Sequence, residues 1–187
     1  IVVLVVSITL DQIYGDGQML TPTILANILV RSVALGIVAM GQTFAIIGAS
    51  IDLSVAYTVS MTAVMASYWM QDDPERVPMA VVLVFIMGAG IGLINGLLTT
   101  KLKVNAFIAT LGTGLVIKGL LNAAFSNFTG AVPRSFQSFG YDYIGPVPIS
   151  ALILLAVVIV SWFVLSRTRF GAHLYAVGGN QEASRLS

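Results

Sequence analysis

The chain has 187 residues, of which 57% are hydrophobic and only 9% charged, and its formal net charge is +1. Soluble domains carry about 25% charged residues, so this composition excludes an ordinary soluble protein, and the small net charge gives no indication of nucleic-acid binding. The absence of cysteine excludes disulfides, thiolate metal sites and cysteine nucleophiles, and the single histidine, His173, argues against a histidine-built metal centre.

The chain begins within an apolar run, Ile1–Leu10, that is too short to cross a bilayer. A spanning helix needs about 20 apolar residues, because each residue rises about 1.5 Å and the hydrocarbon core is about 30 Å thick. We expect this run to be the end of a truncated first span. Because the sequence also stops abruptly at Ser187, we expect the chain to be truncated at both ends.

Five longer apolar segments follow, and the clearest, Val77–Thr100, contains no charged side chain. Such continuous runs exclude the alternating strands of a β-barrel, and too few polar residues remain to cover a large soluble core. We predict an all-α, polytopic transmembrane helical bundle with about five full spans after the truncated first one. The predicted spans are Ile24–Ile47, Leu53–Met70, Val77–Thr100, Val104–Phe125 and Ile149–Leu165.

The segment Gly48–Ser54, between the first two of these spans, contains the acidic residue Asp52. Two structures fit it equally well. Asp52 is either the N-cap of a helix that starts at a short cytoplasmic turn, or part of a helix broken inside the membrane, whose unwound backbone lines a polar cavity. The residues alone leave both alternatives open.

Polar side chains also occur on the apolar helices. They are Gln42, Thr43, Asn95, Asn105, Thr110 and Thr113. For each one alone, the simpler interpretation is a hydrogen bond between helices, worth about 0.6 kcal/mol. The functional interpretation is a path of neutral hydrogen-bonding groups suited to a hydroxylated solute. Gln42 and Asn105 are the strongest candidates, because an amide offers both donors and acceptors.

Charge placement predicts the orientation of the spans. Most basic residues outside the membrane lie in the connection after the third full span and in the tail: Lys101, Lys103, Arg167, Arg169 and Arg185. The other connections are mainly acidic and contain only Arg76 and Arg134 as basic residues. Basic connections face the cytoplasm, and the alternation of acidic and basic connections agrees with the span count. Arg31 and Lys118 lie near the external ends of their spans, where we expect them to extend to the lipid headgroups.

The longest external connection, Ser126–Pro148, is rich in proline and glycine, which predicts an irregular backbone. Its aromatic residues favour a belt at the membrane surface over the alternative, a docking face for an external partner. These residues are Phe128, Phe136, Phe139, Tyr141 and Tyr143.

No catalytic motif is present in the sequence. It lacks Gly-x-Ser-x-Gly, His-Glu-x-x-His and a phosphate-binding loop, since Gly178-Gly179-Asn180 is not followed by Lys-Ser/Thr. Asp52 alone is a thin basis for proton coupling. We therefore predict that the chain is not an enzyme, and that active transport would draw its energy from a partner.

The tail after the last span, residues 167–187, is polar and contains a break at Gly178-Gly179-Asn180. Asn180 is a candidate N-cap for a helix starting at Gln181, and Glu182 in its first turn complements the helix dipole. We expect a short amphipathic helix on the cytoplasmic surface. A basic anchor against anionic lipid is the simpler alternative.

Several motifs, in order along nearly the whole chain, resemble the permease subunit of bacterial ATP-binding-cassette (ABC) sugar importers. These permeases are of the ribose, xylose and galactose type and are related to branched-chain amino-acid permeases. The motifs are Met40–Phe44, Gly48–Val55, Asn105–Gly112, Thr168–Gly171 and Ala176–Ser187. The family usually has Gly-Gly-Ile-Asp-Leu-Ser-Val-Gly, whereas this chain starts the motif with Ala49-Ser50 and ends it with Ala56. The Ile-Asp-Leu-Ser core, Ile51–Ser54, is intact.

The resemblance implies a single transmembrane permease domain over residues 1–187, in the bacterial cytoplasmic (inner) membrane. It implies a dimer or heterodimer with a second permease subunit, two cytoplasmic ATPase subunits that hold ATP and Mg²⁺, and an external, periplasmic sugar-binding protein. Membrane lipid surrounds the assembly, and this chain itself needs no cofactor. The implied function is to form the translocation path for a monosaccharide that the external protein delivers.

The resemblance also assigns candidate site residues. The translocation path would include Gln42, Asp52, Ser54, Asn105 and Thr110. The cytoplasmic coupling segment, residues 167–187, would dock on the ATPase through Gly178, Gly179, Asn180, Glu182 and Arg185. Three alternatives stay open: a branched-chain amino-acid ABC permease, an ion-coupled secondary transporter, and a structural membrane protein.

Overall fold

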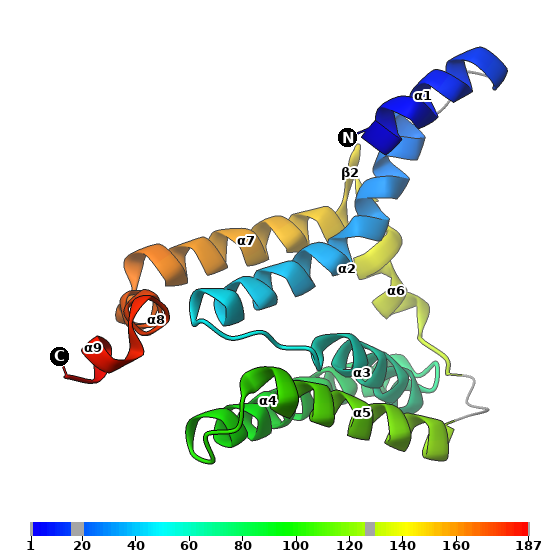
Figure 1. The fold of residues 1–187 in the computed structure, drawn as a ribbon. Helices are drawn as coiled ribbons and strands as arrows, with labels where there is room; N and C mark the ends of the chain where they lie inside the picture. The colour runs from blue at the N-terminus through cyan, green and yellow to red at the C-terminus, as the bar shows by residue number, and fades with distance from the viewer. Residues whose placement is uncertain (1, 16–20, 126–129, 187) are drawn as a thin grey trace.

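A computed structural model describes residues 2–15, 21–125 and 130–186 (Figure 1). The elements are α1 (Val2–Tyr14), α2 (Pro22–Ile47), α3 (Val55–Met70), the 3-10 helix η1 (Pro74–Arg76), α4 (Val77–Thr100), α5 (Ala106–Phe125), α6 (Arg134–Tyr141), β1 (Tyr143–Ile144), β2 (Val147–Pro148), α7 (Ile149–Arg167), α8 (Arg169–Gly179) and α9 (Gln181–Leu186). The prediction of an all-α helical bundle is confirmed.

Within the described part of the chain, four helices are long and apolar enough to cross a membrane: α2, α4, α5 and α7. α4 begins and ends at the predicted residues. α3 is the exception, because its 16 residues cover only about 24 Å. It is shorter than the predicted span Leu53–Met70, since Leu53 and Ser54 belong to the loop before it.

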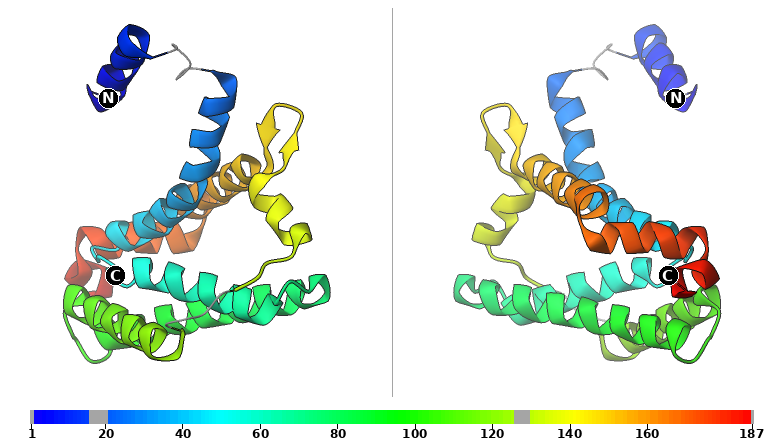
Figure 2. Two further views of the ribbon diagram at one scale, coloured as in Figure 1. Left: turned by 90° about the vertical axis from the view of Figure 1, so that its right-hand side faces the viewer. Right: turned by 90° about the vertical axis from the view of Figure 1, so that its left-hand side faces the viewer.

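The helices pack in two groups (Figure 1). In one group α3, α4 and α5 contact one another, and in the other α2 packs along α7 while α8 packs against both. α6 contacts α7 and η1, and Figure 2 shows it lying between the two groups. The loop from α2 to α3 also connects the two groups. If one group moves relative to the other, the structural change therefore falls on this loop or on the contacts of α6.

The connections gather at two ends of the molecule (Figure 1). The turn between α4 and α5, which carries Lys101 and Lys103, lies on the same side as the end of α2 and α8; we call this the basic end. η1, α6 and the β1–β2 hairpin lie on the opposite side, which we call the acidic end. This placement agrees with the alternation of basic and acidic connections in the sequence.

The connection at residues 126–148 is more regular than predicted. Its described part contains α6, which begins after the fully buried Pro133, and a hairpin whose turn includes Gly145 with φ of +61°. Proline fixes a backbone suited to the residue before a helix, and glycine tolerates the positive φ. The predicted irregular backbone is therefore wrong for residues 134–141, 143–144 and 147–148. Phe128 lies outside the described residues.

Most apolar side chains of the long helices face outward. Phe85 is 75% exposed, Leu35 is 71% exposed and Ile108 is 65% exposed, whereas only five hydrophobic side chains of the described residues, prolines not counted, are buried. Soluble proteins rarely expose contiguous apolar patches of this kind. The helices are built to be solvated by hydrocarbon.

Candidate translocation site

The loop Gly48–Ser54 ends inside the bundle, some distance from the ends of α4 and α5 at the basic end. Ser54 contacts Asn95, which lies five residues before the end of α4, and Asn95 in turn contacts Thr113, seven residues after the start of α5. At 1.5 Å per residue these positions are about 8 and 10 Å from the helix ends at the basic end. The start of α3 is therefore recessed into the bundle by about two helical turns.

A chain of hydrogen bonds fixes this recessed loop. The Thr113 hydroxyl donates to the amide oxygen of Asn95 (2.7 Å), whose amide nitrogen donates to the Ser54 hydroxyl (3.0 Å). The Ser54 hydroxyl and backbone N–H both donate to one carboxylate oxygen of Asp52, at 2.6 and 2.8 Å. Every donor points toward the Asp52 carboxylate, so the four residues form one connected chain of hydrogen bonds. We call these four residues the polar network.

Two further side chains hold the loop backbone beside the polar network. The Thr110 hydroxyl, which is 3% exposed, accepts from the backbone N–H of Leu53 at 3.0 Å. The amide nitrogen of Gln42 donates to the carbonyl oxygen of Asp52, while its amide oxygen is buried and has no partner among the described residues. Gln42 therefore retains a free acceptor beside the loop.

These contacts exclude Asp52 as the N-cap of α3. The Asp52 carboxylate closes a short turn on Ser54, the N-cap residue, whose own side chain makes no capping bond to the helix. The backbone before α3 is unwound and lies against polar side chains of α4 and α5. Non-helical backbone among apolar helices requires polar partners, which the polar network and Thr110 supply.

The structure brings together four of the five predicted path residues: Gln42, Asp52, Ser54 and Thr110. Asn105 lies apart, exposed at the start of α5, where its side chain accepts from the backbone N–H of Phe107 (2.9 Å). Sequence reasoning ranked Asn95 and Thr113 too low. A signal was present, because Asn95 is the only amide or charged residue in α4.

The tail segment that is predicted to couple to the ATPase packs, through α8, directly on the end of α2. A side chain at Gly178 would overlap the carbonyl oxygen of Ile47, and Leu174 lies against Gly48. The rings of Phe44 and Phe170 also meet, with centroids 6.4 Å apart. α8 therefore contacts the last turn of α2 immediately before the chain enters the loop Gly48–Ser54.

The predicted N-cap at Asn180 is confirmed. Its side-chain oxygen accepts from the backbone N–H of Ala183 at 3.0 Å, and α9 follows from Gln181. Glu182 and Arg185 on α9 are exposed, as is Gly179 at the end of α8. Unlike Gly178, these residues face outward and are available to a partner.

Residues suited to a metal ion do not gather in the described ranges, where no three His, Cys, Asp or Glu side chains lie close together. The site thus consists of neutral hydrogen-bonding groups around one carboxylate.

Comparison with known proteins identifies relatives over most of the chain. A family described as the branched-chain amino acid transport system / permease component matches residues 24–187. The galactose/methyl galactoside import permease protein MglC of Escherichia coli (strain K12) is 35% identical over 94% of this chain and 58% of its own length. The ribose import permease protein RbsC of Bacillus subtilis (strain 168) is 34% identical over 100% of this chain and 57% of its own.

The inner membrane ABC transporter permease protein YjfF of Escherichia coli (strain K12) is 34% identical over 87% of this chain and 51% of its own length. The chain thus spans about half the length of the curated relatives it matches. No solved structure gave a match. Together with the apolar helices, these relatives establish a multi-pass membrane protein.

Proposed function

Because the chain belongs to the family of branched-chain amino acid transport system permease components, we propose that it is a transmembrane permease subunit of an ATP-driven importer in the bacterial inner membrane. Its described residues contain an unwound, hydrogen-bonded loop within the bundle and a surface segment packed beside it. The first suits solute passage and the second suits docking of an energy-supplying partner.

The solute we propose is a monosaccharide. Although the family description refers to branched-chain amino acids, the relatives MglC and RbsC are named for the import of galactose or methyl galactoside and of ribose. The polar groups near the loop are amides and hydroxyls, which match sugar hydroxyls in offering donors and acceptors. A periplasmic sugar-binding protein would deliver the solute at the acidic end.

The translocation path would run along the loop Gly48–Ser54. In this proposal the polar network fixes the loop, and Gln42 presents its unpartnered amide oxygen to the passing solute. Asp52 and Ser54 shape the loop, and Thr110 holds its backbone to α5. Asn105, at the exposed start of α5, would act only at the cytoplasmic mouth.

Packing of Gly178 on Ile47 is the observation that carries the coupling proposal. ATP would bind to separate cytoplasmic ATPase subunits, which would dock on α9 and the adjacent Gly179 and Asn180. Displacement of α8 would move the end of α2 and hence the loop Gly48–Ser54. With a second permease subunit, this motion would change which side the path faces, as rigid-body switching does, and ATP would supply the free energy through its different affinities for the two states.

The test is to replace Glu182 and Arg185 together by alanine in the full-length assembly and to measure sugar-stimulated ATP hydrolysis and uptake. We expect stimulation to fall while basal hydrolysis persists, because both side chains are exposed and the docking surface is changed rather than the fold. Unchanged stimulation and uptake would show that Glu182 and Arg185 do not couple the chain to the ATPase.

A second measurement separates ATP-driven import from an ion-coupled mechanism. Uptake by the unaltered assembly should stop when ATP is depleted and should persist in the presence of an uncoupler while ATP is maintained. The opposite pattern would indicate a secondary transporter.

A further inference from the structure

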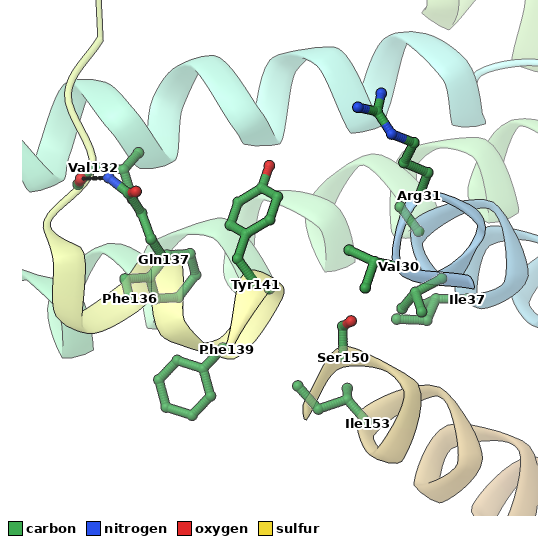
Figure 3. Close-up of a pocket in the computed structure, with 13 residues that line it drawn as sticks. Val30, Arg31, Ile37, Val132, Phe136, Gln137, Phe139, Tyr141, Ser150 and Ile153 are labelled. Atoms are coloured by element: carbon green, nitrogen blue, oxygen red, sulfur yellow. Dashed lines mark hydrogen bonds between the residues drawn. The ribbon is translucent and has the colours of Figure 1, made fainter. Parts of the chain in front are cut away.

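A cavity at the acidic end contains a buried hydroxyl without a partner. The cavity, about 710 Å³, lies between α2, α6 and the start of α7 (Figure 3). Ser150, in the first turn of α7, lines it and is 6% exposed, and its hydroxyl has no hydrogen-bond partner among the described residues. An unpaired buried hydroxyl costs about 1–3 kcal/mol, so its presence calls for a ligand group.

Arg31 adds a charged donor to the same cavity. It is the only charged residue of α2 and lies nine residues after the helix start at Pro22. Arg31 is exposed and lines the cavity wall, with no hydrogen bond or ion pair to any other described residue, and its extension to the headgroups stays a prediction. A charge inside a membrane span is costly and marks a functional position.

Aromatic side chains of α6 supply the remaining walls. Phe136, Phe139 and Tyr141 line the cavity, and Gln137 is held by a hydrogen bond from its amide nitrogen to the carbonyl oxygen of Val132 at 2.6 Å. In Figure 3 the Tyr141 hydroxyl and the Arg31 guanidinium point to the same side of the cavity. A mostly apolar, aromatic cavity of this size with a few polar groups is typical of small-molecule sites.

We propose that this cavity is the external-side binding site for a hydroxylated solute of monosaccharide size. Ser150, Arg31 and Tyr141 would bind the solute's hydroxyl and ring oxygens, and Phe136 would pack on the apolar face of its ring. The inference rests on the proposed import function and adds where the solute first contacts the chain. Gln42 lies eleven residues after Arg31, about three turns along the same face of α2, toward the basic end.

The experiment uses single-cysteine labelling, which the cysteine-free sequence permits. Ser150→Cys is introduced into the full-length assembly in mild detergent, with any other reactive cysteine of the assembly replaced. The rate of reaction with a small thiol reagent is measured alone and with excess D-galactose, D-ribose or phosphatidylglycerol. Ser166→Cys, an exposed serine near the other end of α7, is the matched control.

We expect one of the sugars to slow labelling of the Ser150→Cys variant at least threefold and to leave the Ser166→Cys variant unchanged. No slowing by either sugar, equal slowing of both variants, or slowing by phosphatidylglycerol alone would overturn the proposal; the last result would identify a lipid site.

Uptake kinetics provide a readout that does not depend on the cysteine variant. Ser150→Ala should raise the KM for uptake roughly three- to tenfold, the loss expected for one hydrogen bond. The melting temperature of the sugar-free assembly should not fall, because the variant removes an unpaired buried hydroxyl. Ser166→Ala should change neither value. An unchanged KM for Ser150→Ala would overturn the proposal. The import function itself fails only if the unaltered assembly takes up neither sugar in an ATP-dependent manner, so the two failures are distinguishable.

Discussion

The two polar regions among the membrane-spanning helices differ in what their side chains bind. In the polar network, Ser54, Asn95 and Thr113 all have hydrogen-bond partners within the protein. In the cavity, Ser150 and Arg31 have none among the described residues. A satisfied network fixes a backbone, whereas unsatisfied groups gain free energy when a ligand arrives. Similar residue types thus fix the loop backbone in the polar network and, in our proposal, bind the solute in the cavity.

The largest effect is expected at the end of α2, the helix that contacts both regions. Gly178→Ala would place a methyl group on the carbonyl oxygen of Ile47, so α8 must move away from α2. We expect sugar-stimulated ATP hydrolysis by the assembly to fall more than tenfold, the equivalent of about 1.4 kcal/mol or more. Gly92→Ala is the matched control, because no atom lies near the added methyl group. Full stimulation in the Gly178→Ala variant would show that α8 transmits nothing through this contact.

Asn95→Leu removes the central side chain of the polar network. It leaves the half-buried Thr113 hydroxyl without its acceptor and removes the donor to the Ser54 hydroxyl, which stays bonded to Asp52. Such a loss costs about 1–3 kcal/mol. We expect a lower melting temperature of the detergent-solubilised assembly. Asn122→Leu, at an exposed position on α5, should leave it unchanged. If Ser150→Ala lowers the melting temperature as much as Asn95→Leu does, then Ser150 also stabilises the fold, and the difference between the cavity and the polar network is wrong.

Gly114→Ala sharpens the comparison by changing packing without removing a polar group. The added methyl group would lie 2.5 Å from the Tyr57 ring, which forces α3 and α5 apart beside the polar network. Overpacking of this kind costs about 1–3 kcal/mol, and we place this variant at the lower end because the Tyr57 ring can turn. Gly112→Ala, on the same helix with open space around it, provides the control in the same unfolding assay.

The smallest effect is expected at Asn180, which belongs to neither region. Asn180→Ala removes the side-chain acceptor for the Ala183 N–H and should destabilise α9 by about 1 kcal/mol. We expect a two- to fivefold loss of sugar-stimulated ATP hydrolysis. Asn180→Asp, which retains an acceptor at the N-cap, should restore it. Equal loss in both variants would mean that the amide contacts the partner directly and that capping is secondary.

The sequence predicts the long helices well because their signal is local. Val77–Thr100 is a helix at both predicted ends, since an uncharged apolar run of this length has only one stable form in lipid. The short helix α6 was missed because its eight residues form against α7 and η1, a tertiary contact that no local pattern reports.

The candidate site was predicted only in part for the same reason. Gln42 and Asn105 carry the same amide group, yet one contacts the loop and the other caps α5 at the surface. Asn95 and Thr113 meet only because α4 and α5 pack side by side. Which polar side chains become partners is decided by helix packing, and hydropathy does not encode it.

The uninterrupted length of α2 has a mechanical consequence. Its 26 residues form one continuous helix that bends part-way along, with Arg31 toward the acidic end and α8 packed against its other end (Figures 1 and 2). From Arg31 to Ile47 the helix covers about 24 Å, so a tilt of about 5° over this part moves its far end by roughly 2 Å, enough to break a hydrogen bond. Displacement of α8 at the basic end would therefore reach groups about three turns away along a single continuous helix.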